Sequence, residues 1–263
     1  MVTEAVFEKN QTIKKVDLSV VSTVLRAGWK DFRAAPTHLY FLVLIYPIVM
    51  LVGVWAALND NLIPLVFPIV SGAALLGPFS AIALYEMSRQ RGAGRRVTWW
   101  QALRLVAARA APAIGLLALA LAVTFVLWLW VGLLLYRDLL GVAEDPSLGG
   151  FLGEVFSTSA GWTLILVGNA VGLLFAVVVL AGFVVSFQVV IDRNAGPLEA
   201  VVTSLRVFTV NPVTVVAWGL TIALLLAATV VTLFVGLAVV LPLLGHASWH
   251  FYCRTVGAVS AAD

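Results

Sequence analysis

The chain has 263 residues, of which 62% are hydrophobic and only 11% are charged. Soluble domains carry about 25% charged residues, so this composition and a mean hydropathy of +1.06 exclude an ordinary soluble protein and predict a polytopic membrane protein. The formal net charge of +3 does not indicate nucleic-acid binding, because the basic residues lie beside apolar segments and form no separate module. The single cysteine, Cys253, excludes an intrachain disulfide.

Six apolar segments are predicted to cross the membrane as helices, since roughly 20 residues at about 1.5 Å each span the hydrocarbon layer. These six spans fall at 39–58, 62–85, 112–136 and 162–191, with two more inside 213–253. As one helix, 213–253 would reach roughly 60 Å, twice the hydrocarbon thickness. We therefore expect two helices with a turn near Thr232 to Gly236, although one span with a re-entrant piece stays open. A short amphipathic helix is expected near 151–156.

An amphipathic helix is predicted before each pair of spans, lying in the membrane interface with apolar residues on one face and basic residues elsewhere. The apolar stripe of the first such helix comprises Leu18, Val21, Leu25, Trp29 and Phe32. Each helix should end at a proline, because the residue before a proline disfavours helix. The three breaks are Ala35-Pro36, Ala111-Pro112 and Asn211-Pro212.

The predicted fold is an all-α membrane bundle of three parallel helical-hairpin repeats within one membrane domain, residues 13–255. The repeats fall at about 13–96, 97–193 and 196–254, and the ends 1–12 and 256–263 are expected to be short tails. All Lys and Arg residues except Arg137 fall on the side that holds both termini. This bias predicts that the N-terminus and the C-terminus are cytoplasmic.

Several short stretches of the chain resemble a bacterial inner-membrane family catalogued as domain of unknown function 2189. The stretches are Gly77-Pro78-Phe79, Leu84-Tyr85-Glu86, Ser204-Leu205-Arg206, Asn211-Pro212 and Leu241 to Tyr252, which contains Gly-His-Ala-Ser-Trp-His. The resemblance covers roughly residues 20–255. It implies a bacterial inner-membrane location and no established activity, although some members carry a cytochrome c oxidase label.

That label implies association with an oxidase and not catalysis. An oxidase core needs many histidines to bind haem and copper, whereas this chain has three, His38, His246 and His250. The resemblance therefore points to respiratory complex subunits as partners.

Four side chains form the predicted metal site. His246 and His250 are four residues apart on one helix face, and Cys253 lies one turn further on. Glu86 ends the second span at a similar depth and could supply a fourth ligand for zinc, copper or haem iron. The alternative is that both histidines form hydrogen bonds with backbone or lipid head groups.

Other polar residues have structural or functional alternatives. Asn169 is expected to make an interhelical hydrogen bond, and Glu86 with Asp192 could line a proton or ion pathway. The residues expected to kink or pack helices are Pro36, Gly77, Pro78, Pro112, Pro212 and Gly245.

No nucleophile elbow, P-loop, dinucleotide fingerprint or HExxH motif occurs in the chain. The function predicted from these observations is a non-enzymatic accessory or scaffold protein without a cofactor, which contacts the lipid bilayer, anionic head groups and respiratory subunits. The first alternative is a metal- or haem-binding redox or assembly factor that uses His246 and His250. The second is a small-molecule or lipid transporter, which would need a polar cavity lined by Asn169, Glu86 and Ser80.

Overall fold

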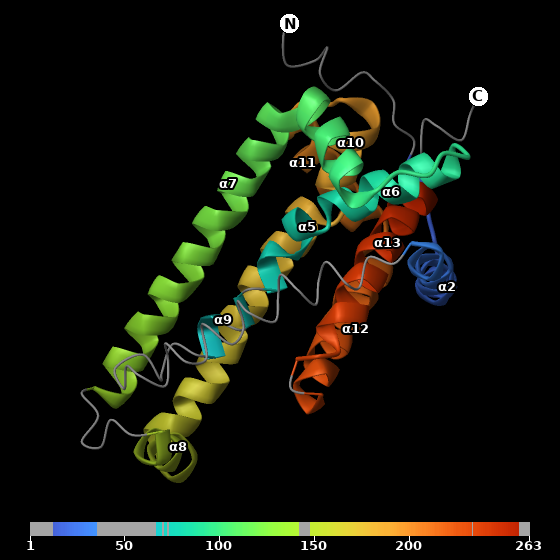
Figure 1. The fold of residues 1–263 in the computed structure, drawn as a ribbon. Helices are drawn as coiled ribbons and strands as arrows, with labels where there is room; N and C mark the ends of the chain where they lie inside the picture. Colours follow the sequence, from blue (N-terminus) through green and yellow to red (C-terminus); the bar gives the residue numbers. More distant parts are fainter. Residues whose placement is uncertain are drawn as a thin grey trace, which may run out of the picture. The chain divides into compact units, whose positions relative to one another are not determined.

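The computed structural model describes residues 13–35, 67–69, 71–72, 74–141, 148–232 and 234–257. Every regular element among these residues is a helix, which confirms the all-α class (Figure 1). The chain forms two compact units. Unit 1 comprises Met1–Val43, Pro78–Ala118 and Leu180–Asp263, and unit 2 comprises Leu44–Gly77 and Leu119–Val179.

Three of the described stretches are long and apolar enough to cross a membrane. They are α7 (Trp99–Leu140), the stretch Ser159–Arg193 and α12 (Pro212–Val231). These stretches match the predicted third, fourth and fifth spans. Most of the predicted first and second spans lies outside the described residues, and α13 (Leu237–Thr255) is not among the three. The six-span count and the hairpin repeats therefore stay predictions.

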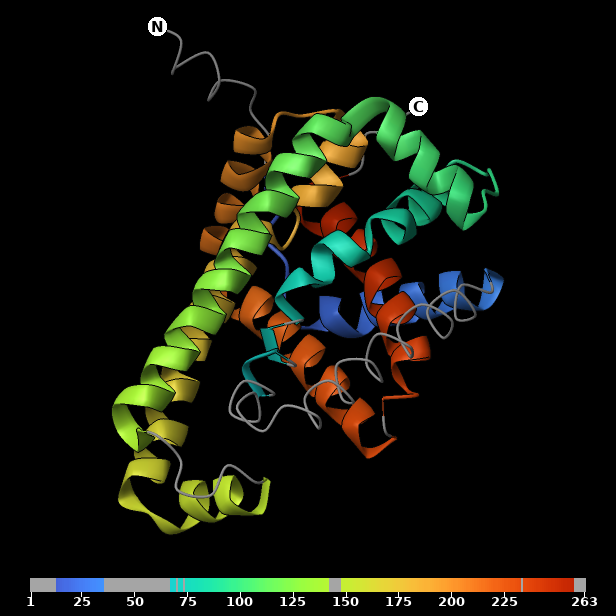
Figure 2. The ribbon, with the colours of Figure 1, turned by 60° about the vertical axis from the view of Figure 1, so that its left-hand side comes forward.

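The predicted helix break at Ala111-Pro112 is wrong, because α7 runs without interruption from Trp99 to Leu140 with Pro112 inside it. An internal proline costs about 3 kcal/mol through a lost hydrogen bond and a steric clash. The buried residues Ala102, Val106, Ala110 and Ile114 continue one helical stripe past this point, so tertiary packing maintains the helix. Figure 2 shows α7 changing direction in its first third, as a proline kink does.

The break at Asn211-Pro212 is confirmed. α11 (Pro197–Val210) ends there, and Pro212 takes the first turn of α12, where its missing N–H costs nothing. The turn predicted near Thr232 to Gly236 is also confirmed, because α12 ends at Val231 and α13 begins at Leu237. Its backbone is held partly by a hydrogen bond from the Phe234 N–H to the Thr229 carbonyl (2.8 Å).

The first amphipathic helix is α2 (Ser19–Ala34), and it lies across α13 in unit 1. Figure 1 shows α2 along its axis while α12 and α13 are seen from the side. The predicted stripe is not the buried one, since Leu18 is 55% exposed and Trp29 is 44% exposed. The buried residues of α2 are instead Val20, Val24, Gly28 and Asp31.

The reason for this correction is a close helix contact at Gly28. A Cβ placed on Gly28 would lie 2.7 Å from the Ala247 backbone nitrogen. A residue with a side chain at this position would collide with Ala247, so α2 turns its glycine toward α13. The larger side chains of the predicted stripe are left beside the contact, partly exposed.

The remaining helices of unit 1 are α6 (Ile82–Gly92), α10 (Ser186–Arg193) and α11. The first seven residues of α6, Ile82 to Ser88, are all buried. In the chain, α6 follows the short elements η2 (Ala74–Leu76) and α5 (Gly77–Ser80). This buried helix brings Glu86 and Ser88 into the interior of unit 1.

Unit 2 contains the second part of α7, α8 (Leu148–Ser157) and most of α9 (Ser159–Phe183). The expected short helix at 151–156 is found as α8. Trp128 of α7 anchors this unit, since its indole Nε1 donates to the Pro68 carbonyl (2.8 Å) and its ring lies 5.7 Å from that of Phe175.

Candidate functional site

The buried Asp31 carboxylate of unit 1 joins three helices, α2, α6 and α13. Its Oδ2 accepts hydrogen bonds from Ser88 Oγ of α6 (2.7 Å) and from His250 Nε2 of α13 (2.9 Å). Its Oδ1 pairs with Arg91 Nε at 3.1 Å. Asp31 is only 6% exposed. We call Asp31, Ser88, Arg91, His246 and His250 the Asp31 cluster.

The direction of the hydrogen bonds in the Asp31 cluster follows from the number of available protons. Ser88 has one hydroxyl hydrogen and donates it to the carboxylate, which can only accept. The contact between Ser88 Oγ and His246 Nδ1 (2.8 Å) must then be a hydrogen bond donated by the imidazole. His246 therefore carries its proton on Nδ1 when neutral, and its Nε2 has a lone pair that finds no hydrogen-bond partner in the described structure.

Two opposing effects act on the pKa of Asp31. Burial raises the pKa, but hydrogen bonds from His250 and Ser88 and the positive charge of the histidines outweigh burial and hold it below its ordinary value of 3.8. Asp31 is therefore ionised at neutral pH. As an anion it can accept all three hydrogen bonds at once.

A second buried carboxylate, Glu86, is fully enclosed by donors from its own chain. Arg89 binds both of its oxygens (2.8 and 2.9 Å), Gln90 donates to Oε1 (2.6 Å), and Arg109 of α7 donates to Oε2 (3.1 Å). Glu86 has no exposed surface. Because its oxygens are occupied in this way, Glu86 lines no open cavity among the described residues.

A third polar group links α10 to the end of α13. The Tyr252 hydroxyl donates to Asp192 Oδ2 (2.8 Å) and accepts from Arg193 Nε (3.1 Å), while Arg193 Nη2 donates to the Gly257 carbonyl (2.8 Å). These bonds satisfy a carbonyl just beyond α13. They hold α10 and α13 together where both helices end.

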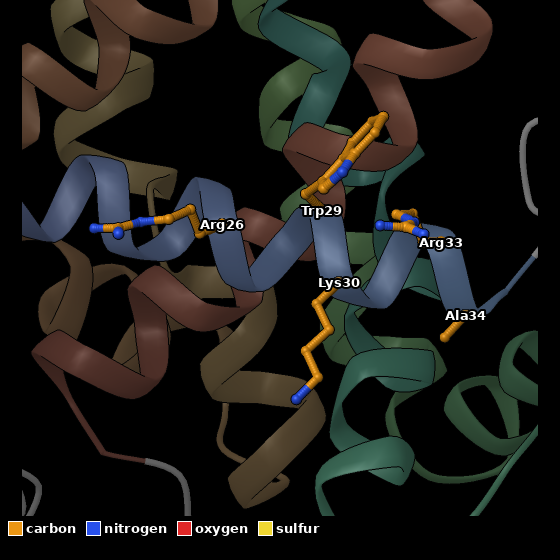
Figure 3. A pocket seen from close by; sticks show the side chains of 5 residues that line it. All are labelled: Arg26, Trp29, Lys30, Arg33 and Ala34. Atoms are coloured by element: carbon orange, nitrogen blue, oxygen red, sulfur yellow. The ribbon is translucent and has the colours of Figure 1, made fainter.

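The outer surface of α2 has a shallow open pocket of about 320 Å³. It is lined by Arg26, Trp29, Lys30, Arg33 and Ala34 (Figure 3). Arg26 bonds only within its own helix, to Ser22. No carboxylate of the described residues forms an ion pair with any of its three cations. The pocket thus has three exposed positive charges beside an aromatic ring.

The comparison with known families bears on the middle of the chain. Residues 66–192 match the family described as "Predicted integral membrane protein (DUF2189)". The matched stretch is similar to this family, and we call it the DUF2189 segment. No curated protein and no solved structure matches the chain.

The DUF2189 match confirms the resemblance inferred from the sequence, over a shorter range than 20–255. Glu86, Ser88 and Arg109 lie inside the DUF2189 segment. The Gly-His-Ala-Ser-Trp-His stretch, which was part of the inferred resemblance, lies outside the DUF2189 segment, as does all of α2. Glu86, Ser88 and Arg109 each form hydrogen bonds with other side chains of unit 1.

The residues of the predicted metal site have separate partners in the structure. His246 contacts Ser88, His250 contacts Asp31, and Glu86 is closed by arginines, while Cys253 is half-buried. Among the described residues, no three His, Cys, Asp or Glu side chains are grouped as metal ligands. Metal binding by this set stays a prediction.

The residues expected to have structural roles differ in their surroundings. A Cβ at Gly245 would collide with the Leu84 side chain, so this glycine lets α13 approach α6, whereas Gly77 has open space around it. In unit 2, Asn169 is exposed and its amide donates to the Ile165 carbonyl of its own helix (2.7 Å). The structure thus shows an intrahelical bond for Asn169 where an interhelical one was expected. Pro36 lies outside the described residues.

Sequence reasoning missed Asp31, Ser88 and Arg109. Asp31 lies within the first predicted amphipathic helix, but it was assigned no role. The sequence does contain a signal that Asp31 is buried. Val20, Val24, Gly28 and Asp31 follow one another at steps of four, four and three, which places them on one helix face. Nothing in the local sequence distinguishes Ser88 or Arg109 from neighbouring polar residues.

Proposed function

We propose that this protein is a non-enzymatic accessory or scaffold protein of a bacterial inner membrane. The observation that carries the proposal is the ion pairing of two buried carboxylates in unit 1. Asp31 and Glu86 form ion pairs that join α2, α6, α7 and α13. Buried ion pairs of this kind fix how helices pack, whereas a catalytic carboxylate has to reach a substrate.

The outer side of the same unit supports a role in contacts. Leu18 and Trp29 expose apolar surface, and the α2 pocket exposes three cations. The partners we propose are anionic lipid head groups and, on the oxidase label carried by some family members, subunits of a respiratory complex. Both termini are proposed to be cytoplasmic, on the distribution of Lys and Arg along the sequence.

The accessory role is tested by extracting the tagged protein from its native membranes in mild detergent and identifying stoichiometric co-purifying proteins by mass spectrometry. We expect a partner with the wild type. A partner held through α2 should be depleted with Asp31→Asn, which loosens α2, and retained with Asp138→Asn, a matched change at an exposed acid of α7. Recovery of the protein alone, with wild type and both variants, would refute the accessory role.

A second candidate function, a metal- or haem-binding redox or assembly factor, is favoured by His246 Nε2. This nitrogen is buried and has no partner in the described structure, while Nδ1 donates to Ser88 Oγ (2.8 Å). Metal-binding histidines are commonly oriented by such a second hydrogen bond. Metal analysis and a visible spectrum of the purified protein test this candidate, with His246→Ala as the comparison. A featureless spectrum without bound metal would remove it.

A further inference from the structure

The surface of α2 divides into three faces, because each residue advances the helix by about 100°. Val20, Val24, Gly28 and Asp31 are buried, and Gly28 and Asp31 contact α13. About a quarter turn away lies the partly exposed apolar stripe that contains Leu18 and Trp29. Beyond this stripe, nearly opposite α13, lie Arg26, Lys30 and Arg33.

Three positively charged side chains lie close together on the face of α2 opposite α13. Arg26, Lys30 and Arg33 occupy positions i, i+4 and i+7, so they are neighbours on one surface of the helix. Like charges at this spacing destabilise a helix by a few tenths of a kcal/mol per pair. No carboxylate of the described part of the chain offsets them. An external anion would offset this repulsion.

The orientation of α2 places these faces relative to a bilayer. α12 is apolar and long enough to cross a membrane, and α2 lies across α12 and α13 in unit 1 (Figures 1 and 2). A helix across a membrane span lies in the plane of the membrane. Its apolar stripe then enters the acyl boundary, and Trp29 sits at head-group level, where indole rings are enriched.

We propose that the α2 pocket formed by Arg26, Trp29, Lys30 and Arg33 is a binding site for the phosphate of an anionic membrane phospholipid. Guanidinium groups bind phosphate oxygens in pairs, and Lys30 adds a point charge. The site rests on the contact with anionic lipid head groups proposed above, but not on a protein partner, because lipid binding to the isolated protein needs none.

The test measures lipid binding to the full chain in non-ionic detergent by native mass spectrometry, with dioleoylphosphatidylglycerol and dioleoylphosphatidylcholine as probes. The site variant carries Arg26→Gln, Lys30→Gln and Arg33→Gln. The matched control variant carries three glutamines at exposed cations outside the pocket: Lys15→Gln, Arg96→Gln and Arg104→Gln. Both variants lose three positive charges, so each has a formal net charge of 0 instead of +3.

We expect the wild type to prefer phosphatidylglycerol, with an affinity that falls as salt rises. A basic residue near an anionic surface contributes about fivefold in affinity, so the site variant should lose roughly 10- to 100-fold. The control should stay within about twofold. Inorganic phosphate at the lipid concentration should not displace the lipid, since the apolar stripe contacts the acyl region.

Four results would refute the proposed site. They are an equal loss of lipid affinity in the site and control variants, equal affinity of the wild type for phosphatidylcholine and phosphatidylglycerol, an unchanged lipid affinity of the site variant, and displacement of the lipid by inorganic phosphate. A thermal melt of the site variant keeps the test decisive. All three substituted side chains are exposed, so its midpoint should match the wild type. A matching midpoint together with weaker lipid binding assigns the loss to the pocket.

Discussion

Replacing Asp31 by asparagine should loosen α2 from α6 and α13. The change keeps the shape of the side chain but removes its charge. Asp31 now accepts from Ser88 and His250 through Oδ2 and from Arg91 through Oδ1. An asparagine has one carbonyl oxygen, so its NH₂ group must face a donor on one side or the other.

The magnitude follows from the hydrogen bonds that are lost. A hydrogen bond to a charged group contributes about 1.5–3 kcal/mol, and the surviving bonds weaken because the acceptor becomes neutral. Arg91 is 36% exposed, so solvent screens its ion pair and its share is small. We expect a loss of about 2–3 kcal/mol, which corresponds to roughly 4–12 °C in the unfolding midpoint.

Cys253 provides the assay because it is the only cysteine in the chain and lies half-buried in α13. A thiol-reactive fluorophore should label it rapidly once α13 comes loose, so labelling during a thermal ramp reports the unfolding midpoint. Asp138→Asn, at an exposed position, should change the free energy of unfolding by no more than about 0.5 kcal/mol. A shift below 1 °C for Asp31→Asn would refute the structural importance of the Asp31 cluster.

The pH dependence of the same variant has a definite sign. The folded pKa of Asp31 is lowered, so its stabilising effect is complete above the unfolded-state pKa near 3.8 and is lost as pH falls through the folded pKa. The difference in midpoint between wild type and Asp31→Asn should therefore shrink as the pH falls below about 4. A difference that grows below about pH 4 would contradict an ionised Asp31.

Two further substitutions test the packing of α13. Gly28→Ala should destabilise the protein by about 1–3 kcal/mol, because the new Cβ meets the Ala247 backbone, which cannot rotate away. The control is Gly115→Ala, which has open space around it and should be neutral or stabilising. Equal effects of the two substitutions would contradict the close contact at Gly28. Tyr252→Phe should cost about 1–3 kcal/mol, because it removes the hydroxyl that donates to Asp192. Both are measured by the Cys253 labelling midpoint, and an unchanged midpoint for Tyr252→Phe would show that this hydroxyl contributes nothing.

Hydropathy was sufficient to locate α7, α9 and α12, because a membrane span has to be apolar along its whole length. Local rules also placed the Asn211-Pro212 break and the turn after Val231. The proline rule failed at Pro112, because the packed stripe that begins at Ala102 continues on both sides of it. Local propensity predicts a helix end only where tertiary packing does not oppose it.

The Asp31 cluster lay beyond sequence reasoning for a different reason. Asp31 bonds to Ser88, 57 positions away, and to His250, 219 positions away. No periodicity connects such residues, and an acid on an amphipathic helix is normally expected to face water. The two histidines were recognised as a pair on one helix face, but the groups they bind come from other helices.

The distance in sequence between α2 and α13 has a consequence for biosynthesis. α2 emerges from the ribosome before every predicted span, yet the Ala247 backbone and the His250 imidazole that it contacts belong to α13. At 5–20 residues per second, the 219 residues between Asp31 and His250 take about 10–40 s to make. During that interval Asp31 and Gly28 of α2 lack the His250 imidazole and the Ala247 backbone, although Ser88 and Arg91 of α6 are already made. The hydrogen bond to His250 and the close helix contact at Gly28 therefore form only after α13 has been synthesised, and a chain that stops before α13 leaves α2 without both.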